Sequence, residues 1–282
     1  MTSRLSPGRP ARRHILPGLN LTLGYAVLYL SVIVLIPLAA LVLKAAGLGL
    51  DGFWAAINTP RVWSALRVSF LTALAASLVN LPIGLVIAWT LTRYRVPGRR
   101  VVDALIDLPF ALPTAVAGIT LTTLLSPNGW LGGPLLEAGL RVAYTPLGII
   151  VALIFIGLPF VVRSLQPVLE DLGHEPEEAA LSLGATPSQT FARVILPALS
   201  PALLSGFTLA LARTIGEYGS VVFISGNLPF KTEIAPLLIV GKLEQYDYAG
   251  AAAVAVAMLV ISVTLLLAAN GAQARLSRRE QG

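Results

Sequence analysis

Residues 21–43 read LTLGYAVLYLSVIVLIPLAALVL, and none of them carries a charge. The run without Asp, Glu, Lys or Arg extends further upstream and covers residues 14–43. A helix needs about 20 predominantly apolar residues to cross the hydrocarbon core of a bilayer. This stretch is therefore long enough to form one transmembrane helix.

Five more charge-free windows follow along the chain, at 68–92, 108–136, 142–162, 194–212 and 248–274. Each is too long for one strand of a membrane barrel, and none shows the alternation of apolar and polar residues that a barrel strand needs. The sequence therefore predicts an all-α, polytopic membrane protein. Trimmed at charges and turn residues, its six predicted transmembrane helices are 21–43, 67–91, 104–125, 146–165, 199–224 and 249–270.

The overall composition agrees with this prediction. Charged residues make up 12% of the 282 residues and hydrophobic residues 56%, with a mean hydropathy of +0.80. An average soluble domain has about 25% charged residues, and disordered chains combine low hydrophobicity with high charge. The chain has no cysteine, which excludes disulfides, thiolate metal sites and cysteine nucleophiles.

The Lys and Arg residues predict the orientation. With a cytoplasmic N-terminus, 13 of the 20 Lys and Arg residues lie in cytoplasmic segments, as the positive-inside rule requires. Both tails, 1–20 and 273–282, are then cytoplasmic. The net charge of +6 reflects this topology and contact with anionic lipid, and no basic face is left over to bind nucleic acid.

The N-terminal region also resembles a signal peptide, because a basic stretch precedes an apolar one. The apolar run exceeds the roughly 7–15 residues of such a signal. No small-x-small cleavage site closes it before Lys44, although Ala45-Ala46-Gly47 follows directly. We therefore expect 21–43 to be a retained transmembrane helix.

The connection between the fourth and fifth spans, about 166–198, is rich in structural signals. Pro176 suits the first turn of a helix, and Gly184 suits its end. A second helix begins at once, with Thr186 as N-cap, Pro187 in the first position and Gln189 as capping-box partner. The loop is thus predicted to be a helix–turn–helix, and its first arm is acidic, with Glu170, Asp171, Glu175, Glu177 and Glu178.

Two interpretations of this loop are open from physical chemistry. It could be an amphipathic connector on the membrane surface, but anionic lipid would repel the acidic first arm. Small residues with carboxylates fit better in a groove of a soluble partner. The loop also resembles the EAA loop, about 175–197, of binding-protein-dependent ABC importer permeases. The family pattern E-A-A-x3-G-x9-I-x-L-P is matched, with valine in place of the isoleucine, by Glu178, Ala179, Ala180, Gly184, Val194, Leu196 and Pro197.

This resemblance implies that the loop docks on a separate cytoplasmic ATPase and transmits its closure to the membrane helices. ATP and Mg would then be used by that partner, and this chain would need no cofactor. The sequence itself has no G-x-x-x-x-G-K-[ST] phosphate-binding loop, no H-E-x-x-H and no G-x-S-x-G. Its two histidines, His14 and His174, stand apart. We therefore expect no catalytic site, no metal site and no enzymatic activity in this chain.

Several polar and helix-breaking residues fall inside predicted spans. Arg213 and Glu217 are four residues apart, so they share a helix face. Ionisable residues in membrane helices usually face the bundle interior or a watery path, so the two form either a structural ion pair or part of an anion path. Pro109 and Pro113 must disturb the third span, either as a static kink or, with Thr114, as a break that lines the pathway.

The segment 212–227 looks like the oxyanion group of these permeases, which includes sulfate, thiosulfate and molybdate permeases. The stretch 232–251 is similar to the T subunit of sulfate/thiosulfate importers, which pairs with a second, W-type permease. Between the last two spans, 225–248 is predicted to be an outside loop. It is either an ordinary solvated loop or the docking surface for a binding protein, with Lys231, Glu233, Tyr246 and Asp247 as contacts.

The resemblance implies a permease subunit of an ATP-driven ABC importer that moves sulfate, and also thiosulfate, by alternating access. Its implied partners are the W-type permease, two cytoplasmic ABC ATPase subunits and a periplasmic or lipid-anchored sulfate-binding protein. It would lie in the cytoplasmic (inner) membrane of a bacterium as a multi-pass protein. The alternatives are a molybdate or tungstate ABC permease, a secondary anion transporter, which would tend to show internal repeats, and a membrane scaffold without transport.

Overall fold

The computed structural model describes residues 19–279, and every regular element in that range is a helix. Five helical segments are long and apolar enough to cross a membrane, and a bent pair of helices makes up to six. The predicted all-α membrane fold is therefore confirmed. The elements are α1 (Leu19–Leu30), η1 (Ser31–Leu35, a π-helical segment), α2 (Ile36–Ala46), α3 (Gly49–Ile57), α4 (Pro60–Arg93), α5 (Arg99–Ala111), α6 (Thr114–Leu125), α7 (Gly132–Glu137), α8 (Pro146–Leu172), α9 (Glu175–Ser182), α10 (Pro187–Thr190), η2 (Phe191–Ile195, also π-helical), α11 (Leu196–Ile215), α12 (Val221–Ile224), α13 (Ala235–Glu244) and α14 (Tyr248–Arg279).

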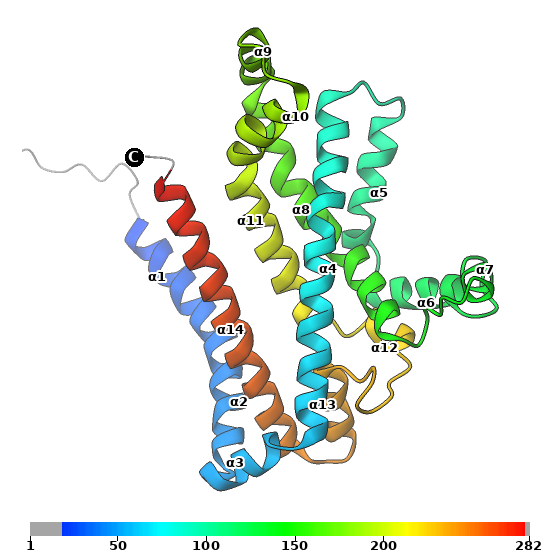
Figure 1. Cartoon of the computed structure of the whole chain (residues 1–282). Helices are drawn as coiled ribbons and strands as arrows, with labels where there is room; N and C mark the ends of the chain where they lie inside the picture. Colours follow the sequence, from blue (N-terminus) through cyan, green and yellow to red (C-terminus); the bar gives the residue numbers. More distant parts are fainter. Residues whose placement is uncertain (1–18, 280–282) are drawn as a thin grey trace, which may run out of the picture.

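The centre of the molecule is a packed group of α4, α8 and α11 (Figure 1). Small residues let these helices approach closely, as is usual between membrane helices. A Cβ atom on Gly84 of α4 would lie 2.6 Å from Val161 Cγ1 of α8, so no larger side chain fits there. The buried face of α4 is lined by small side chains, which include Ala73, Ala76, Ser77, Gly84 and Ala88.

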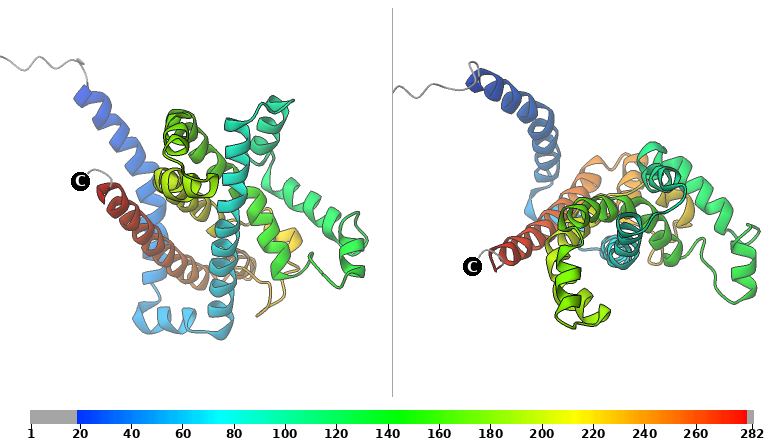
Figure 2. Two further views of the ribbon diagram at one scale, coloured as in Figure 1. Left: turned by 45° about the horizontal axis from the view of Figure 1, so that its top comes forward. Right: turned by 90° about the horizontal axis from the view of Figure 1, so that it is seen from above.

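The first helix stands at the side of this group. The segments α1, η1 and α2 form one apolar rod, and the span Leu21–Ala46 has no residue buried inside this chain across its most apolar window. Within the described chain its packing partner is α14, which contacts α2 and α3. Figures 1 and 2 show α1 standing apart from the central helices in every view.

The third predicted span, 104–125, is wrong as a single crossing helix. The chain forms α5 and α6, which are bent by 112° where they meet. Pro109 lies inside α5 near its end, and Pro113 precedes the first residue of α6. The residue before a proline avoids the helical conformation, and Leu112 is extended with ψ 135°. Helix α6 therefore leaves the bundle sideways and carries α7 with it (Figures 1 and 2).

The fifth predicted span, 199–224, is also wrong as one helix, because helix α11 ends at Ile215. Gly216 follows in a non-helical conformation. The chain then runs irregularly to the short helix α12. The segment 225–248, predicted to be an outside loop, also differs from the prediction. It contains the helix α13, whose residues Ala235 and Leu238 belong to the hydrophobic core.

The remaining spans are longer than predicted, because charged residues extend them beyond the apolar windows. Helix α4 begins at the N-cap Thr59 and continues to Arg93, and α8 continues to Leu172. Helix α14 reaches Arg279, so most of the predicted tail 273–282 is helical. The predicted N-terminal tail 1–20 lies almost entirely outside the described residues. The start of α1 and the end of α14 lie at the same end of the bundle as α9 and α10 (Figure 1).

Candidate functional site

The loop between α8 and α11 folds as two short helices joined by a turn, which we name the hairpin (residues 175–195). Helix α9 carries Glu175, Glu177 and Glu178 in its first turn, where acidic side chains favour the helix dipole. Gly184 has φ +80°, a conformation that glycine adopts without strain. The capping box of α10 is present in both directions between Thr186 and Gln189.

The predicted coupling residues do not all face the same way. Glu178, Ala179 and Gly184 are exposed at the end of the molecule, whereas Ala180 is buried. The exposed surface of α9 also holds two residues that were not predicted to matter: Leu181 is 53% and Leu183 is 89% exposed. Exposed leucines beside exposed acidic residues are typical of a surface that a partner protein covers.

The second arm of the hairpin continues without interruption into the membrane. Residues Pro187–Ile215 form one helical rod of 29 residues that includes η2. Of the pattern residues in this arm, Val194 is half-buried, while Leu196 and Pro197 are exposed on the rod. Pro197 lies inside this rod, directly after the π-helical segment η2, where the regular α-helical hydrogen-bond ladder is already interrupted. The hairpin and α11 therefore share one continuous helical segment.

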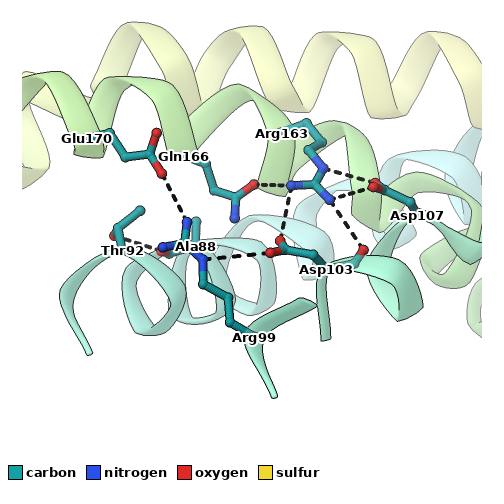
Figure 3. A network of polar contacts seen from close by, with 8 residues as sticks. All are labelled: Ala88, Thr92, Arg99, Asp103, Asp107, Arg163, Gln166 and Glu170. Carbon is teal, nitrogen blue, oxygen red and sulfur yellow. Dashed lines mark hydrogen bonds and ion pairs between the residues drawn. The ribbon is translucent and has the colours of Figure 1, made fainter. Parts of the chain in front are cut away.

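An ionic network fixes α5 to α8 near the hairpin end (Figure 3). Arg163 of α8 donates hydrogen bonds to Asp107 Oδ1 at 2.9 Å and Oδ2 at 2.6 Å. It also donates to Asp103 at 3.3 Å and to Gln166 at 2.6 Å. Arg99 extends the network by pairing with Asp103 and with Glu170. Of these residues, Arg99 and Arg163 served only to predict the orientation, because partners 56 and 60 positions apart in sequence cannot be paired by pattern.

The other end of α11 holds the predicted pair Arg213 and Glu217. The two side chains form an ion pair. Glu217 lies beyond the end of α11, so the prediction that the two residues share one helix face is wrong. Glu217 is only 4% exposed, and its Oε1 accepts hydrogen bonds from the Ser220 amide at 3.0 Å and the Ser220 hydroxyl at 3.1 Å. The buried carboxylate thus holds the 216–220 turn closed against Arg213.

The two broken spans meet at this turn. A Cβ atom on Gly118 of α6 would lie 2.5 Å from the Ser220 carbonyl oxygen, and one on Gly219 would overlap the Thr114 hydroxyl. The backbones of α6 and of the 216–220 turn are therefore in direct contact. We name Thr114, Gly118 and residues 216–220 the break cluster. It brings together Thr114, Arg213 and Glu217 of the predicted pathway residues, with Pro113 immediately before Thr114.

A buried amide lies close to the break cluster and was missed by the sequence analysis. Asn80 of α4 is fully buried, and neither its Oδ1 nor its Nδ2 has a hydrogen-bond partner. It packs against Gly157 of α8, and Thr214 lies at the same contact. Buried polar groups in a membrane bundle are normally paired, so this asparagine marks a helix contact that is polar but not closed by hydrogen bonds.

The predicted docking residues of the 225–248 segment separate into two sets. Lys231 and Asp247 are exposed, and Tyr246 is 79% exposed with φ 62°. Glu233 is instead 5% exposed and accepts two hydrogen bonds from Arg61, at 2.8 and 2.7 Å. The prediction that Glu233 contacts a partner is therefore wrong, because it ties the 226–234 segment to the start of α4.

Asp247 fixes the start of α14. Its Oδ1 accepts a hydrogen bond from the Gly250 amide at 2.9 Å, and its Oδ2 accepts one from the Lys242 ammonium at 2.8 Å. The Lys242 ammonium lowers the pKa of Asp247 below its usual value of 3.8, and the Gly250 amide lowers it further. The charged form of Asp247 is therefore favoured in the folded state.

Replacing Asp247 by asparagine is expected to lower stability at neutral pH and to have less effect in acid. The folded-state pKa is lowered, so the stabilisation is complete above about pH 4 and is lost as the pH falls further through that lowered pKa. The measurement is the thermal unfolding midpoint of both proteins in detergent, at pH 7 and at pH 3. Asp247→Ala also removes the helix cap, which is worth about 0.5–2 kcal/mol, and serves as the comparison. An equal difference between wild type and Asp247→Asn at both pH values would contradict the prediction.

Residues 80–282 match the protein family described as "Binding-protein-dependent transport system inner membrane component". The chain belongs to this family. It is a permease subunit of a transporter and not an enzyme, as predicted, and it is a multi-pass protein of the inner membrane. Within the described residues, no group of three or more His, Cys, Asp or Glu side chains could hold a metal ion.

The similar full-length proteins are sulfate transport system permeases. The permease is 50% identical over 270 residues to the sulfate transport system permease protein CysT of Escherichia coli, covering 96% of this chain and 98% of that protein. It is 52% identical over 244 residues to the protein of that name from Synechocystis, covering 86% and 85%. These relatives confirm the resemblance to the T-type sulfate permeases.

Solved structures confirm the fold at lower identity. A bacterial alginate ABC transporter in complex with an alginate pentasaccharide-bound periplasmic protein matches with a TM-score of 0.76 and 19% identity, covering 92% of this chain and 94% of that one. A bacterial ABC transporter that imports alginate matches with a TM-score of 0.75 and 18% identity, covering 91% and 95%. Both support the ABC permease fold of this chain.

Proposed function

We propose that this permease is the T-type subunit of an ATP-driven importer that moves sulfate, and also thiosulfate, into the cell by alternating access. The observation that carries the proposal is the rod Pro187–Ile215, which joins an exposed hairpin to the break cluster inside the bundle. A force applied to the hairpin would reach a place where the two broken spans touch. Sulfate as the cargo rests on the near full-length identity to CysT permeases.

In this proposal the hairpin docks on a cytoplasmic ATPase subunit. Glu178, Ala179 and Gly184 make the contact together with the exposed Leu181 and Leu183, while Ala180 packs under them. Both termini are then cytoplasmic, in agreement with the Lys and Arg distribution. Val194, Leu196 and Pro197 carry the movement into α11. ATP and Mg are bound by two copies of the ATPase and not by this chain.

The break cluster lines the translocation path in the proposed mechanism. The path forms between this chain and a W-type second permease. ATP binding closes the ATPase pair, the hairpin displaces α11, and the 216–220 turn moves against Thr114 and Gly118. The cluster then opens to the outside, and ATP hydrolysis returns it. Arg213 attracts the anion, but its pairing with Glu217 prevents a tight site, so selectivity belongs to a periplasmic or lipid-anchored binding protein that contacts Lys231, Tyr246 and Asp247.

The experiment that tests this function uses the complete transporter in proteoliposomes, with ATP inside and the loaded binding protein outside. Uptake of radiolabelled sulfate should depend on ATP and be inhibited by thiosulfate more strongly than by molybdate. Stronger inhibition by molybdate would favour a molybdate or tungstate permease instead. A purified complex that contains no ATPase after gentle solubilisation would contradict the ABC mechanism and favour a secondary transporter or a scaffold.

A further inference from the structure

Arg93, in the last turn of α4, lies where three segments of the hairpin end meet. Its side chain is only 6% exposed. Nη1 donates a hydrogen bond to the Leu169 carbonyl at 3.1 Å, and Nη2 donates one to the Gly173 carbonyl at 2.7 Å. These carbonyls belong to the last turn of α8 and to the residue that follows it. Carbonyls at a helix end lack partners within the helix, so Arg93 closes the end of α8.

The same guanidinium holds the first arm of the hairpin. Glu177 Oε1 of α9 lies 2.9 Å from Arg93 Nη2, and the Glu177 side chain is 21% exposed. The face of the Trp89 ring covers the guanidinium, with 5.4 Å between Arg93 Cζ and the ring centroid. The ion pair is therefore largely shielded from water. Arg93 therefore donates hydrogen bonds to two carbonyl oxygens and attracts the Glu177 carboxylate by charge, while Glu177 Oε1 and Arg93 Nε have no hydrogen-bond partner. A lysine ammonium lacks the planar fork that places two N–H groups on separate carbonyl oxygens.

The last turn of α4 also contacts the second arm of the hairpin. The rings of Trp89 and Phe191 form an edge-to-face pair with centroids 5.9 Å apart. Trp89 thus lies between Arg93, which holds α9, and η2, which leads into α11. Arg93 and Gly173 are 80 positions apart in sequence, so α4 is linked to this end of the molecule by side-chain contacts. Those with the hairpin include the Arg93–Glu177 and Trp89–Phe191 pairs.

We propose that Arg93 is a positioning residue that transmits the movement of the hairpin to α4, in parallel with the transmission along α11. This inference rests on the proposed ATP-driven function. Without Arg93, the hairpin would still move α11 and, through the two-residue link after Leu172, the end of α8, but α4 would lose its polar contacts with both. The closing of the ATPase would then be only partly converted into movement of the central helices, and ATP would be hydrolysed with less transport.

The test measures sulfate transported per ATP hydrolysed by the reconstituted transporter with its ATPase and binding protein. The substitutions are Arg93→Met and Glu177→Gln, and each is expected to lower this ratio about 3- to 30-fold, the range in which residues of a coupling network act. Arg93→Lys keeps the charge but not the planar fork, so its ratio should lie in between. The matched control is Arg95→Met, two residues away, since Arg95 is exposed and has no ion pair with any described residue.

Unequal effects on transport and ATP hydrolysis distinguish coupling from mere stabilisation. If transport and hydrolysis fall in the same proportion in both test variants, or if Arg93→Met behaves as Arg95→Met does, the proposal is overturned. Should Arg93→Met fail to assemble, Glu177→Gln decides alone, because its side chain is partly exposed and glutamine keeps its size. Failure of the proposed function would look different, because the unsubstituted complex would then hydrolyse no ATP or move no sulfate.

Discussion

Replacing Gly184 by aspartate is expected to abolish sulfate transport and to release the ATPase from the permease. A Cβ atom at this position meets nothing within 4 Å in this chain, and aspartate tolerates positive φ better than most residues. The φ of +80° strains any side chain placed here, and this strain is shared by aspartate and asparagine. A loss specific to aspartate must then arise where the hairpin contacts another protein, which would have to bury an added charge.

The measurement is the amount of ATPase that co-purifies with the permease, together with transport. A contact residue at the centre of an interface is worth about 2 kcal/mol or more, on the order of 30-fold in affinity. Gly184→Asn is the matched control, because asparagine has the same shape and the same backbone tolerance without the charge. Normal transport and normal co-purification of Gly184→Asp would refute the assignment of this hairpin as the coupling element.

A second large effect is expected for Gly219→Ala in the break cluster. The added methyl group would overlap the Thr114 hydroxyl, so α6 and the 216–220 turn must separate. Overpacking of this kind costs about 1–3 kcal/mol, and it acts directly on the contact between the two broken spans. We expect transport to fall by about tenfold or more, equivalent to at least ~1.4 kcal/mol in the affected step, while the ATPase remains bound.

Gly216→Ala is the control for this substitution. Gly216 lies in the same turn, has φ −93° and would place its Cβ atom in open space. A change in turn flexibility alone would affect both variants alike, whereas a steric effect is specific to Gly219. Adding Thr114→Ala to Gly219→Ala removes the overlapping hydroxyl and should recover part of the transport. If both single variants transport normally, the break cluster does not move during transport.

The hairpin could be predicted in detail because its signals are local. The capping box of Thr186 with Gln189 and the positive φ of Gly184 depend on residues within a few positions of each other. The same holds for the four unbroken apolar spans, because in lipid a helix satisfies the backbone hydrogen bonds of a segment from within that segment. These parts of the prediction are independent of how the chain packs.

The broken spans could not be predicted as such, because hydropathy reports how apolar a segment is and not where its backbone turns. The segment 104–125 remains apolar through a 112° bend. The proline at position 113 gave a signal for a break, but a static kink was equally compatible with it. The burial of Glu233 could not be predicted from the sequence for another reason, because its partner Arg61 is 172 positions away. Long-range pairs of this kind require the tertiary structure.

Taken together, α11 connects the two candidate sites at its ends. One end continues into the hairpin, and the other ends one residue before the 216–220 turn. Helices α4 and α8 flank it along its length, and the network around Arg163 fixes α5, which leads to α6, to α8. A movement of this central group therefore reaches the break cluster from both sides, through α11 directly and through α5 and α6.

The isolation of the first helix sets an order for biogenesis. The rod Leu21–Ala46 is synthesised early, but its packing partner within this chain, α14, is the last of the described helices to be made. At about 5–20 residues per second, translation separates the two by roughly 10–50 s. During that time the first helix has lipid, the insertion machinery or another subunit as its neighbour. A chain truncated before α14 would leave this helix inserted in the membrane but unassembled, as a target for membrane proteases.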